Sequence, residues 1–225
     1  MRLPRSLPNQ ITIARLVLAA VLFVILHTIG WAERPEASQS TFAHEVLGRR
    51  TLLLNLGAAI FVLAAISDIL DGQIARAWDL TTDFGRIADP FADKVIVSGA
   101  FLFLVPIAGS GVSAWMVAVI VARESLVDGI RGFAEGRGLA FPASVWGKLK
   151  MVLQCVTVPL ILLVLANAPE SPSLHVVVQT SIGVTIFATL FSGLLYVFKA
   201  RTLLRKGAGG QKVETRVTVE AETSR

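Results

Sequence analysis

The chain has 225 residues, of which 54% are hydrophobic and only 16% charged, and its mean hydropathy is +0.68. Ordinary soluble domains carry about 25% charged residues, so this composition nearly excludes a soluble enzyme, and it excludes a disordered chain. The single cysteine, Cys155, excludes a disulfide scaffold and a zinc site built from several cysteines. The net charge of +5 points to anionic lipid surfaces rather than to nucleic acid, because the chain is so apolar.

The first twelve residues precede the first long apolar run. Leu3, Leu7 and Ile11 recur every four residues, the spacing of an amphipathic helix in the membrane interface. We therefore expect residues 1–12 to form a short N-terminal interfacial helix. A cleaved signal peptide is the alternative interpretation, but no clear cleavage site of small residues follows.

Six apolar runs follow, each long enough to cross a bilayer. We expect an all-α polytopic membrane protein whose six transmembrane helices form one domain over residues 13–198. The expected spans are Ile13–Trp31, Thr51–Leu70, Phe91–Ala108, Ser113–Ala134, Met151–Ala168 and Leu174–Phe198. Residues 199–225 form a polar, glycine-containing tail that we expect to be disordered after residue 206.

Lysine and arginine are unevenly distributed among the connections. In a six-span topology, 18 of the 21 basic residues lie on one side, within residues 1–15, 71–94, 123–150 and 199–225. Because cytoplasmic segments are enriched in Lys and Arg, both termini are predicted in the cytoplasm. The same topology brings most ionisable residues to one membrane face, and charges at membrane depth indicate a functional site.

The densest group of ionisable residues lies between the second and third spans. Asp68 and Asp71 are three residues apart and Asp89 and Asp93 are four apart, so each pair shares a helix face. Four clustered carboxylates repel one another unless a cation lies among them. Oxygen ligands without His or Cys select Mg²⁺, Mn²⁺ or Ca²⁺ rather than zinc. We therefore predict a site for divalent ions, with salt bridges to nearby basic residues as the alternative.

Small and basic residues accompany these carboxylates. Gly72 and Gly85 have no side chain, which lets a bulky ligand approach the backbone closely. Arg76 follows Asp71 by five residues, close enough to reach a phosphate held near the metals. Two divalent ions between such carboxylates are a known arrangement for phosphoryl-type displacement.

These residues together resemble a family signature. At eight positions the chain resembles the CDP-alcohol phosphatidyltransferases, with the pattern Asp68-x2-Asp71-Gly72-x2-Ala75-Arg76-x8-Gly85-x3-Asp89-x3-Asp93. The resemblance implies a six-helix membrane enzyme, usually a homodimer, that uses Mg²⁺ or Mn²⁺. It implies transfer of a phosphatidyl group from a CDP-linked lipid to an alcohol, with release of CMP.

The resemblance also implies roles for single residues. The metal ions would be bound by Asp68, Asp71, Asp89 and Asp93, and Asp93 would also be the base that deprotonates the acceptor hydroxyl. The CDP-lipid would be bound by Asn9, Thr12, Gly72, Ala75, Arg76, Thr82 and Gly85.

Three further segments resemble the bacterial phosphatidylglycerophosphate synthase branch of the family: Leu7–Arg15, Ala122–Arg131 and Gly147–Lys150. This resemblance implies CDP-diacylglycerol and sn-glycerol 3-phosphate as substrates. It also implies a bacterial-type inner membrane with the active site on the cytoplasmic side, contact with membrane lipids and no nucleic-acid partner.

A phosphorylated acceptor needs cationic side chains, and these occur in the fourth span and just before the fifth. We predict that Arg123, Arg131 and Lys148 bind the acceptor phosphate by charge-assisted hydrogen bonds. The alternative is that these residues only anchor helix ends at the lipid headgroups.

Other functions remain open at this point. The same chemistry on inositol phosphate, serine or phosphatidylglycerol is the nearest alternative. A divalent-cation transporter would also place carboxylates in a helix bundle, but it needs polar residues through the whole membrane. The outer halves of the predicted spans are nearly free of charge, which favours the enzyme. An inactive scaffold with an intact motif is the third alternative.

Overall fold

The structure is a computed structural model of the chain. It describes the backbone of residues 7–78, 83–137 and 145–223, and the side chains of residues 10–67, 91–137 and 145–202. The elements are α1 (Leu7–Ala32), a short 3-10 helix η1 (Pro35–Ala37), α2 (Thr41–Gly48), α3 (Arg50–Trp78), α4 (Asp83–Leu104), α5 (Ala114–Glu135), α6 (Val145–Asn167) and α7 (Pro172–Thr223). The described residues contain helices and no strand, which confirms the predicted all-α class.

Four of these helices are long and apolar enough to cross a membrane. They contain the segments Gln10–Ala32, Arg50–Ser67, Val145–Asn167 and Pro172–Thr202. The remaining two predicted spans fall on α4 and α5. α5 carries Arg123, Glu124, Asp128 and Arg131 in its second half, which keeps its hydropathy low. The chain is therefore an integral membrane protein, and the count of six spans stays a prediction.

The N-terminal segment is helical from Leu7 and continuous with the first span, and its interfacial position stays a prediction. α1 begins at Leu7 and continues without interruption into the first span, so residues 7–12 form its first turns; residues 1–6 lie outside the described part. Pro8 lies in the first turn, where a missing backbone N–H costs nothing. No further proline occurs in α1 to end the helix before the span.

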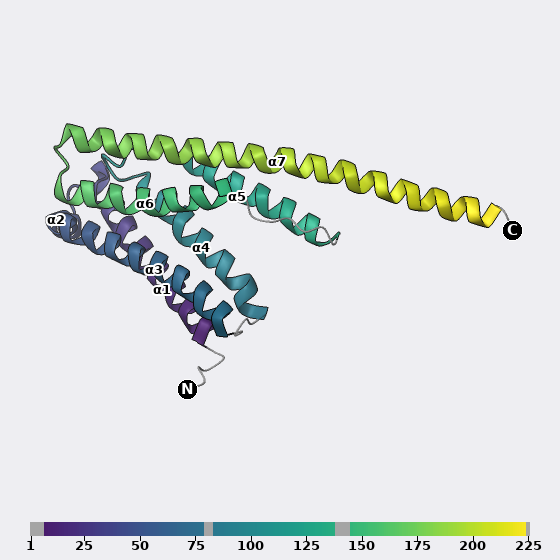
Figure 1. Ribbon diagram of the computed structural model, residues 1–225. Helices are drawn as coiled ribbons and strands as arrows, with labels where there is room; N and C mark the ends of the chain where they lie inside the picture. The colour runs from purple at the N-terminus through teal and green to yellow at the C-terminus, as the bar shows by residue number, and fades with distance from the viewer. Residues whose placement is uncertain (1–6, 79–82, 138–144, 224–225) are drawn as a thin grey trace.

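The helices pack as a bundle in which α1 lies against α3 and α4, while α6 lies between α3 and α7, and α5 packs on α7 (Figure 1). The core is apolar, and its fully buried residues include Leu22, Leu26, Leu54, Phe61, Phe101, Ile161 and Leu162. Large apolar side chains also cover the outer surface, among them Val24, Leu63, Val156 and Phe187. Such an exposed apolar surface suits contact with lipid rather than water.

Hydroxyl groups join α6 to α7 inside the bundle. The Thr157 hydroxyl lies 2.6 Å from the Ser181 hydroxyl and 2.8 Å from the Thr185 hydroxyl. Thr185 is fully buried. Small polar residues hydrogen-bond helices together where water is excluded. These bonds fix the register of α7 against α6. They therefore also fix the relative positions of the functional side chains further along the two helices.

At one end of the bundle, Arg50 joins three chain segments. Its Nε donates to Glu33 Oε1 over 2.9 Å and its Nη1 donates to the Leu165 carbonyl over 2.9 Å. The other Glu33 oxygen accepts a hydrogen bond from the Ala108 N–H over 2.6 Å. The start of α3 is thereby connected to the ends of α1 and α6 and to the segment after α4.

At the opposite end, the start of α1, the end of α3 and the start of α4 lie together, and they diverge from the end of α5 and the start of α6, which lie nearer α7 (Figure 1). The C-terminal part of α7 leaves the bundle at the same end and projects away from the other helices. α7 is helical to Thr223, whereas the sequence predicts disorder after residue 206. No proline after Pro172 interrupts it. A projecting helix that contains Gly207, Gly209 and Gly210 has little to stabilise it in water, so disorder in solution stays a prediction.

Candidate active site

The acidic motif lies on two consecutive helices that turn back on each other. Asp68 and Asp71 lie in the last third of α3, and Asp89 and Asp93 lie in the first half of α4. Residues 79–82 join the two helices, so both acidic segments lie at the same end of the bundle (Figure 1). This is the arrangement that two facing pairs of carboxylates require.

Most of the predicted ligands in this motif lie outside the described side chains. This applies to Asn9, Asp68, Asp71, Gly72, Ala75, Arg76, Thr82, Gly85 and Asp89. Within the side chains that are described, no group of three metal-ligating residues occurs. Of the four predicted metal ligands only Asp93 is among them, so the metal site stays a prediction.

Asp93 connects the acidic motif to the helices that follow it. Its side chain is half-buried on α4, and α4 packs against both α5 and α6. The next residue, Lys94, forms an ion pair with Asp128 on α5. The acidic end of α4 therefore adjoins the polar segments of α5 and α6.

A buried ionic group joins α5 to α6. Arg123 is 8% exposed and Lys150 is 6% exposed. Glu124 Oε1 accepts a hydrogen bond from Arg123 Nη1 over 3.1 Å and a second from Lys150 Nζ. One carboxylate thus serves two cations. Taking charges out of water is expensive, so this local excess of positive charge favours the binding of an anion.

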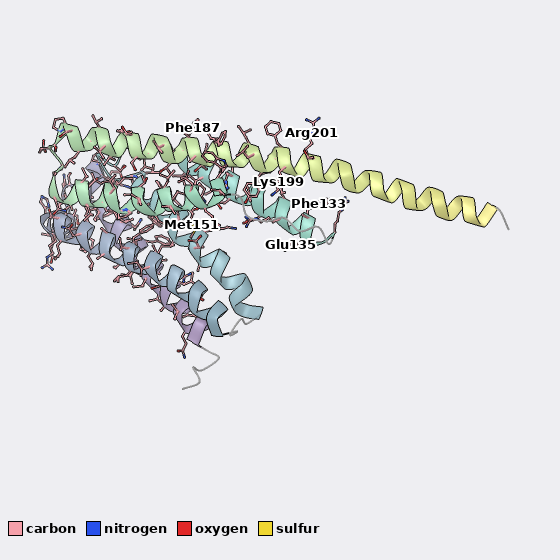
Figure 2. All side chains as sticks on the ribbon, in the orientation of Figure 1. Phe133, Glu135, Met151, Phe187, Lys199 and Arg201 are labelled. Atoms are coloured by element: carbon pink, nitrogen blue, oxygen red, sulfur yellow. The ribbon has the colours of Figure 1, made fainter. Side chains whose placement is uncertain are left out.

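Tyr196 on α7 joins Arg123 to a second arginine. Its ring is buried, and the guanidinium carbons of Arg123 and Arg131 both lie 5.5 Å from the ring centroid. Arg131 Nη2 also donates a hydrogen bond to the Tyr196 hydroxyl over 2.8 Å. Figure 2 shows the neighbouring Lys199 and Arg201 of α7 at the end of the bundle that also holds Phe133 and Glu135 of α5.

Both arginines retain unused hydrogen-bond donors. The Nε atoms of Arg123 and Arg131 are buried and have no hydrogen-bond partner in the described part of the chain. A buried donor without a partner costs about 1–3 kcal/mol. Together with the excess positive charge, these donors form a site whose complement is a small anion such as a phosphate group. We call Arg123, Arg131 and Lys150 the cationic cluster.

The structure separates two lysines of α6 that the sequence places side by side. Lys148, the predicted phosphate ligand, is exposed, whereas Lys150 is buried. Two residues correspond to about 200° around a helix, so the two side chains leave from nearly opposite faces. Lys150, rather than Lys148, therefore lies beside Glu124 and Arg123, and the role predicted for Lys148 stays a prediction.

α1 places two polar side chains inside the bundle near its first turns. Thr12 and Arg15 are each 1% exposed. Thr12 is a predicted ligand of the CDP-lipid, and its inward position is compatible with that role. The sequence analysis predicted no role for Arg15, although an arginine at the start of an apolar run could have indicated a functional residue. A buried guanidinium needs anionic partners, and the acidic ends of α3 and α4 lie at this end of the bundle.

An apolar groove of about 260 Å³ lies between α5 and α7, beside Arg123. Its walls are Val119, Ala122, Leu126, Leu190, Leu194 and Val197. Gly193 allows the close approach of the two helices, because a Cβ atom there would lie 3.1 Å from Arg123 Cγ. The close packing holds the Arg123 side chain against α7.

The geometry agrees with a comparison against protein families. The model of the CDP-alcohol phosphatidyltransferase family matches residues 5–192. The chain belongs to this family. It is therefore an enzyme of the phosphatidyltransferase class, embedded in the membrane by apolar helices.

Curated relatives align with this chain over most of its length. A CDP-diacylglycerol–glycerol-3-phosphate 3-phosphatidyltransferase of Bacillus subtilis is 34% identical, over 86% of this chain and 94% of the relative. A protein of the same name from Rickettsia prowazekii is 32% identical, over 89% and 97%. A probable phosphatidylglycerophosphate synthase of Mycobacterium tuberculosis is 31% identical, over 87% and 81%.

Proposed function

We propose that the protein transfers the phosphatidyl group of CDP-diacylglycerol to sn-glycerol 3-phosphate, giving phosphatidylglycerophosphate and CMP in phospholipid biosynthesis. The observation that carries the proposal is the cationic cluster, in which Arg123 and Lys150 are buried and Arg131 is half-buried, on the helices that pack against the α4 segment containing Asp93. The names of the relatives support the same acceptor.

The cluster favours an acceptor that carries a phosphate. Glycerol 3-phosphate bears close to two negative charges, and the buried Nε donors of Arg123 and Arg131 suit its oxygens. Serine has no phosphate to complement this charge. Inositol phosphate has one, so the cluster alone does not separate it from glycerol 3-phosphate, and the choice between them rests on the relatives.

The reacting groups can be assigned to the two halves of the site. Asp93 would accept the proton of the acceptor hydroxyl while the hydroxyl oxygen attacks the phosphorus that bears diacylglycerol, and the bond to the CMP oxygen breaks. The cationic cluster would hold the acceptor so that its hydroxyl faces that phosphorus. Binding of the CDP-lipid would fall to Asn9, Thr12, Gly72, Ala75, Arg76, Thr82 and Gly85.

The donor set suits hard divalent cations. Four aspartates on two helices joined by four residues supply oxygen ligands only, which fits Mg²⁺ or Mn²⁺. Asp68, Asp71, Asp89 and Asp93 would hold two ions, which neutralise the pyrophosphate and stabilise CMP as a leaving group.

We also propose the membrane arrangement that this chemistry needs. α4 and α5 have 22 residues each, and at 1.5 Å per residue each is about 33 Å long, enough to cross the hydrocarbon core. With α1, α3, α6 and α7 they make six spans. Both termini and the site would then face the cytoplasm of a bacterial-type inner membrane. A homodimer is the expected assembly.

The test is CMP release by purified protein with CDP-diacylglycerol and Mg²⁺, across a panel of acceptors. The panel contains glycerol 3-phosphate, inositol phosphate, serine and phosphatidylglycerol. We expect release with glycerol 3-phosphate alone, loss of release in Asp93→Asn, and normal release in Glu170→Gln. Glu170 is exposed in the connection between α6 and α7, at the end of the bundle away from the site.

Other outcomes of the CMP-release assay would each contradict a different part of the proposal. Release with another acceptor would replace glycerol 3-phosphate and keep the chemistry. Normal release in Asp93→Asn would remove Asp93 as the base. Absence of release with every acceptor, together with divalent-cation flux in liposomes, would favour the transporter.

A further inference from the structure

Tyr196 contacts both arginines of the cationic cluster. It is the only tyrosine of the chain, it is 2% exposed, and it lies on α7 beyond residue 192, where the family match ends. Its ring meets the guanidinium groups of both Arg123 and Arg131 at 5.5 Å. The sequence analysis assigned it no role.

The contact with Tyr196 brings together two arginine side chains that start far apart on α5. Arg123 and Arg131 are eight residues apart on α5, and a rise of 1.5 Å per residue separates their Cα atoms by about 12 Å along the helix. One phosphate group can be bound by both side chains only if they converge. Tyr196 lies on a different helix, α7, and both arginine side chains pack against its ring.

The contact also lowers an electrostatic cost. Two guanidinium groups repel each other, most strongly where water is excluded. The face of an aromatic ring carries negative charge density and attracts a cation. The Tyr196 hydroxyl adds a hydrogen bond to Arg131 Nη2 over 2.8 Å. The contacts leave Nε of each arginine unpaired within the described residues and free to donate to an anion.

We propose that Tyr196 is a positioning residue, which holds Arg123 and Arg131 at the spacing needed to bind the phosphate of the acceptor. It acts through the two arginines and not by contact with the reacting atoms. The proposal rests on the proposed function, because it requires an acceptor that carries a phosphate.

The experiment compares three variants in the CMP-release assay, at saturating CDP-diacylglycerol with varied glycerol 3-phosphate. Tyr196→Leu removes the ring, Tyr196→Phe removes only the hydroxyl, and Phe198→Leu is the control. Phe198 lies two residues further along α7 and is 62% exposed, so its loss removes an aromatic ring on the same helix outside the cluster.

We expect the KM for glycerol 3-phosphate to rise about tenfold in Tyr196→Leu and about threefold in Tyr196→Phe, since each lost contact weakens binding by that order. The kcat and the KM for CDP-diacylglycerol should stay within about twofold of wild type, as should every parameter of Phe198→Leu. A residue that only supports the fold would lower kcat and stability without this selective rise in KM. Inhibition by inorganic phosphate, competitive with glycerol 3-phosphate, should weaken in parallel.

The two proposals fail in different ways. A wild-type protein that releases no CMP with glycerol 3-phosphate refutes the proposed function. A wild-type protein that is active, with an unchanged KM in both Tyr196 variants, refutes the role of Tyr196 and leaves the proposed function intact. If Tyr196→Leu does not fold, the KM of Tyr196→Phe decides, and an unchanged value overturns the proposal.

Discussion

Two lysines two residues apart show how the burial of one residue decides its chemistry. Lys150 is buried and bound to Glu124, while Lys148 is exposed. A charge in water is screened and contributes little, whereas a charge held among buried groups strongly attracts an anion. Lys150 therefore belongs to the cationic cluster, and Lys148 has the surroundings of a headgroup anchor.

This difference leads to a prediction for acceptor binding. Replacing Arg123 or Arg131 with Gln should raise the KM for glycerol 3-phosphate at least about tenfold, because a hydrogen bond to a charged group is worth about 1.5–3 kcal/mol. Steady-state kinetics with varied acceptor measure it. Lys148→Gln is the matched control and should stay within about twofold of wild type. An equal rise in all three variants would mean that the acceptor is attracted by surface charge and not bound in the cluster.

At the level of the helices, two polar groups hold opposite ends of the bundle. The cationic cluster joins α5, α6 and α7 near the site. The Arg50–Glu33 pair joins α1, α3 and α6 at the other end. The first group holds an excess of positive charge for a ligand. The second is satisfied by hydrogen bonds with protein atoms only, so its role is structural.

The second prediction separates these roles. Arg50→Met should lower the free energy of unfolding by about 2 kcal/mol, because it leaves the half-buried Glu33 without its cationic partner. It should leave kcat and both KM values of the folded enzyme near wild type. Thermal unfolding in detergent together with the CMP assay measures both quantities.

Arg49 supplies the control for this experiment. It pairs with Glu45 over 3.1 Å, but its side chain is 67% exposed, so Arg49→Met should change stability by less than about 1 kcal/mol. Equal losses of stability in the two variants would show that the Arg50 contacts add nothing beyond a surface ion pair.

At the scale of the whole molecule, the order of the helices brings the acidic motif and the cationic cluster to one end of the bundle (Figure 1). The acidic motif comes from α3 and α4, and the cluster from α5 and α6 with Tyr196 from α7. The proposed six spans would place both chain ends on this side. A single face of the membrane would then supply the soluble acceptor and receive CMP.

The third prediction concerns this sidedness. In a Cys155→Ser background, Glu135→Cys should react with a membrane-impermeant maleimide only in inverted vesicles, and Glu170→Cys only in intact spheroplasts. Both glutamates are exposed, and they lie at opposite ends of the bundle. Labelling of both positions from the same side would contradict the six-span arrangement.

Much of the fold could be predicted from the sequence because its signals are local. Apolar runs of span length predicted the helical membrane class, and each predicted span overlaps one long helix, although α1, α3, α4, α6 and α7 each extend six or more residues beyond a predicted bound. At the N-terminus, α1 runs from Leu7 into the first span without interruption, and the interfacial position of residues 1–12 stays a prediction. The spacing of the aspartates predicted two acidic helix segments at one end of the bundle, since two helices with a short connection must turn back on each other.

The sequence by itself determined the membrane class, the family and the acidic motif, because these depend on composition and on fixed spacing within short segments. Only the tertiary structure decided which basic residues meet. Arg131 and Tyr196 are 65 residues apart and Glu124 and Lys150 are 26 apart. The face that a helix turns toward its neighbours depends on how distant helices pack, and that packing buried Lys150, exposed Lys148 and placed Tyr196 against both arginines.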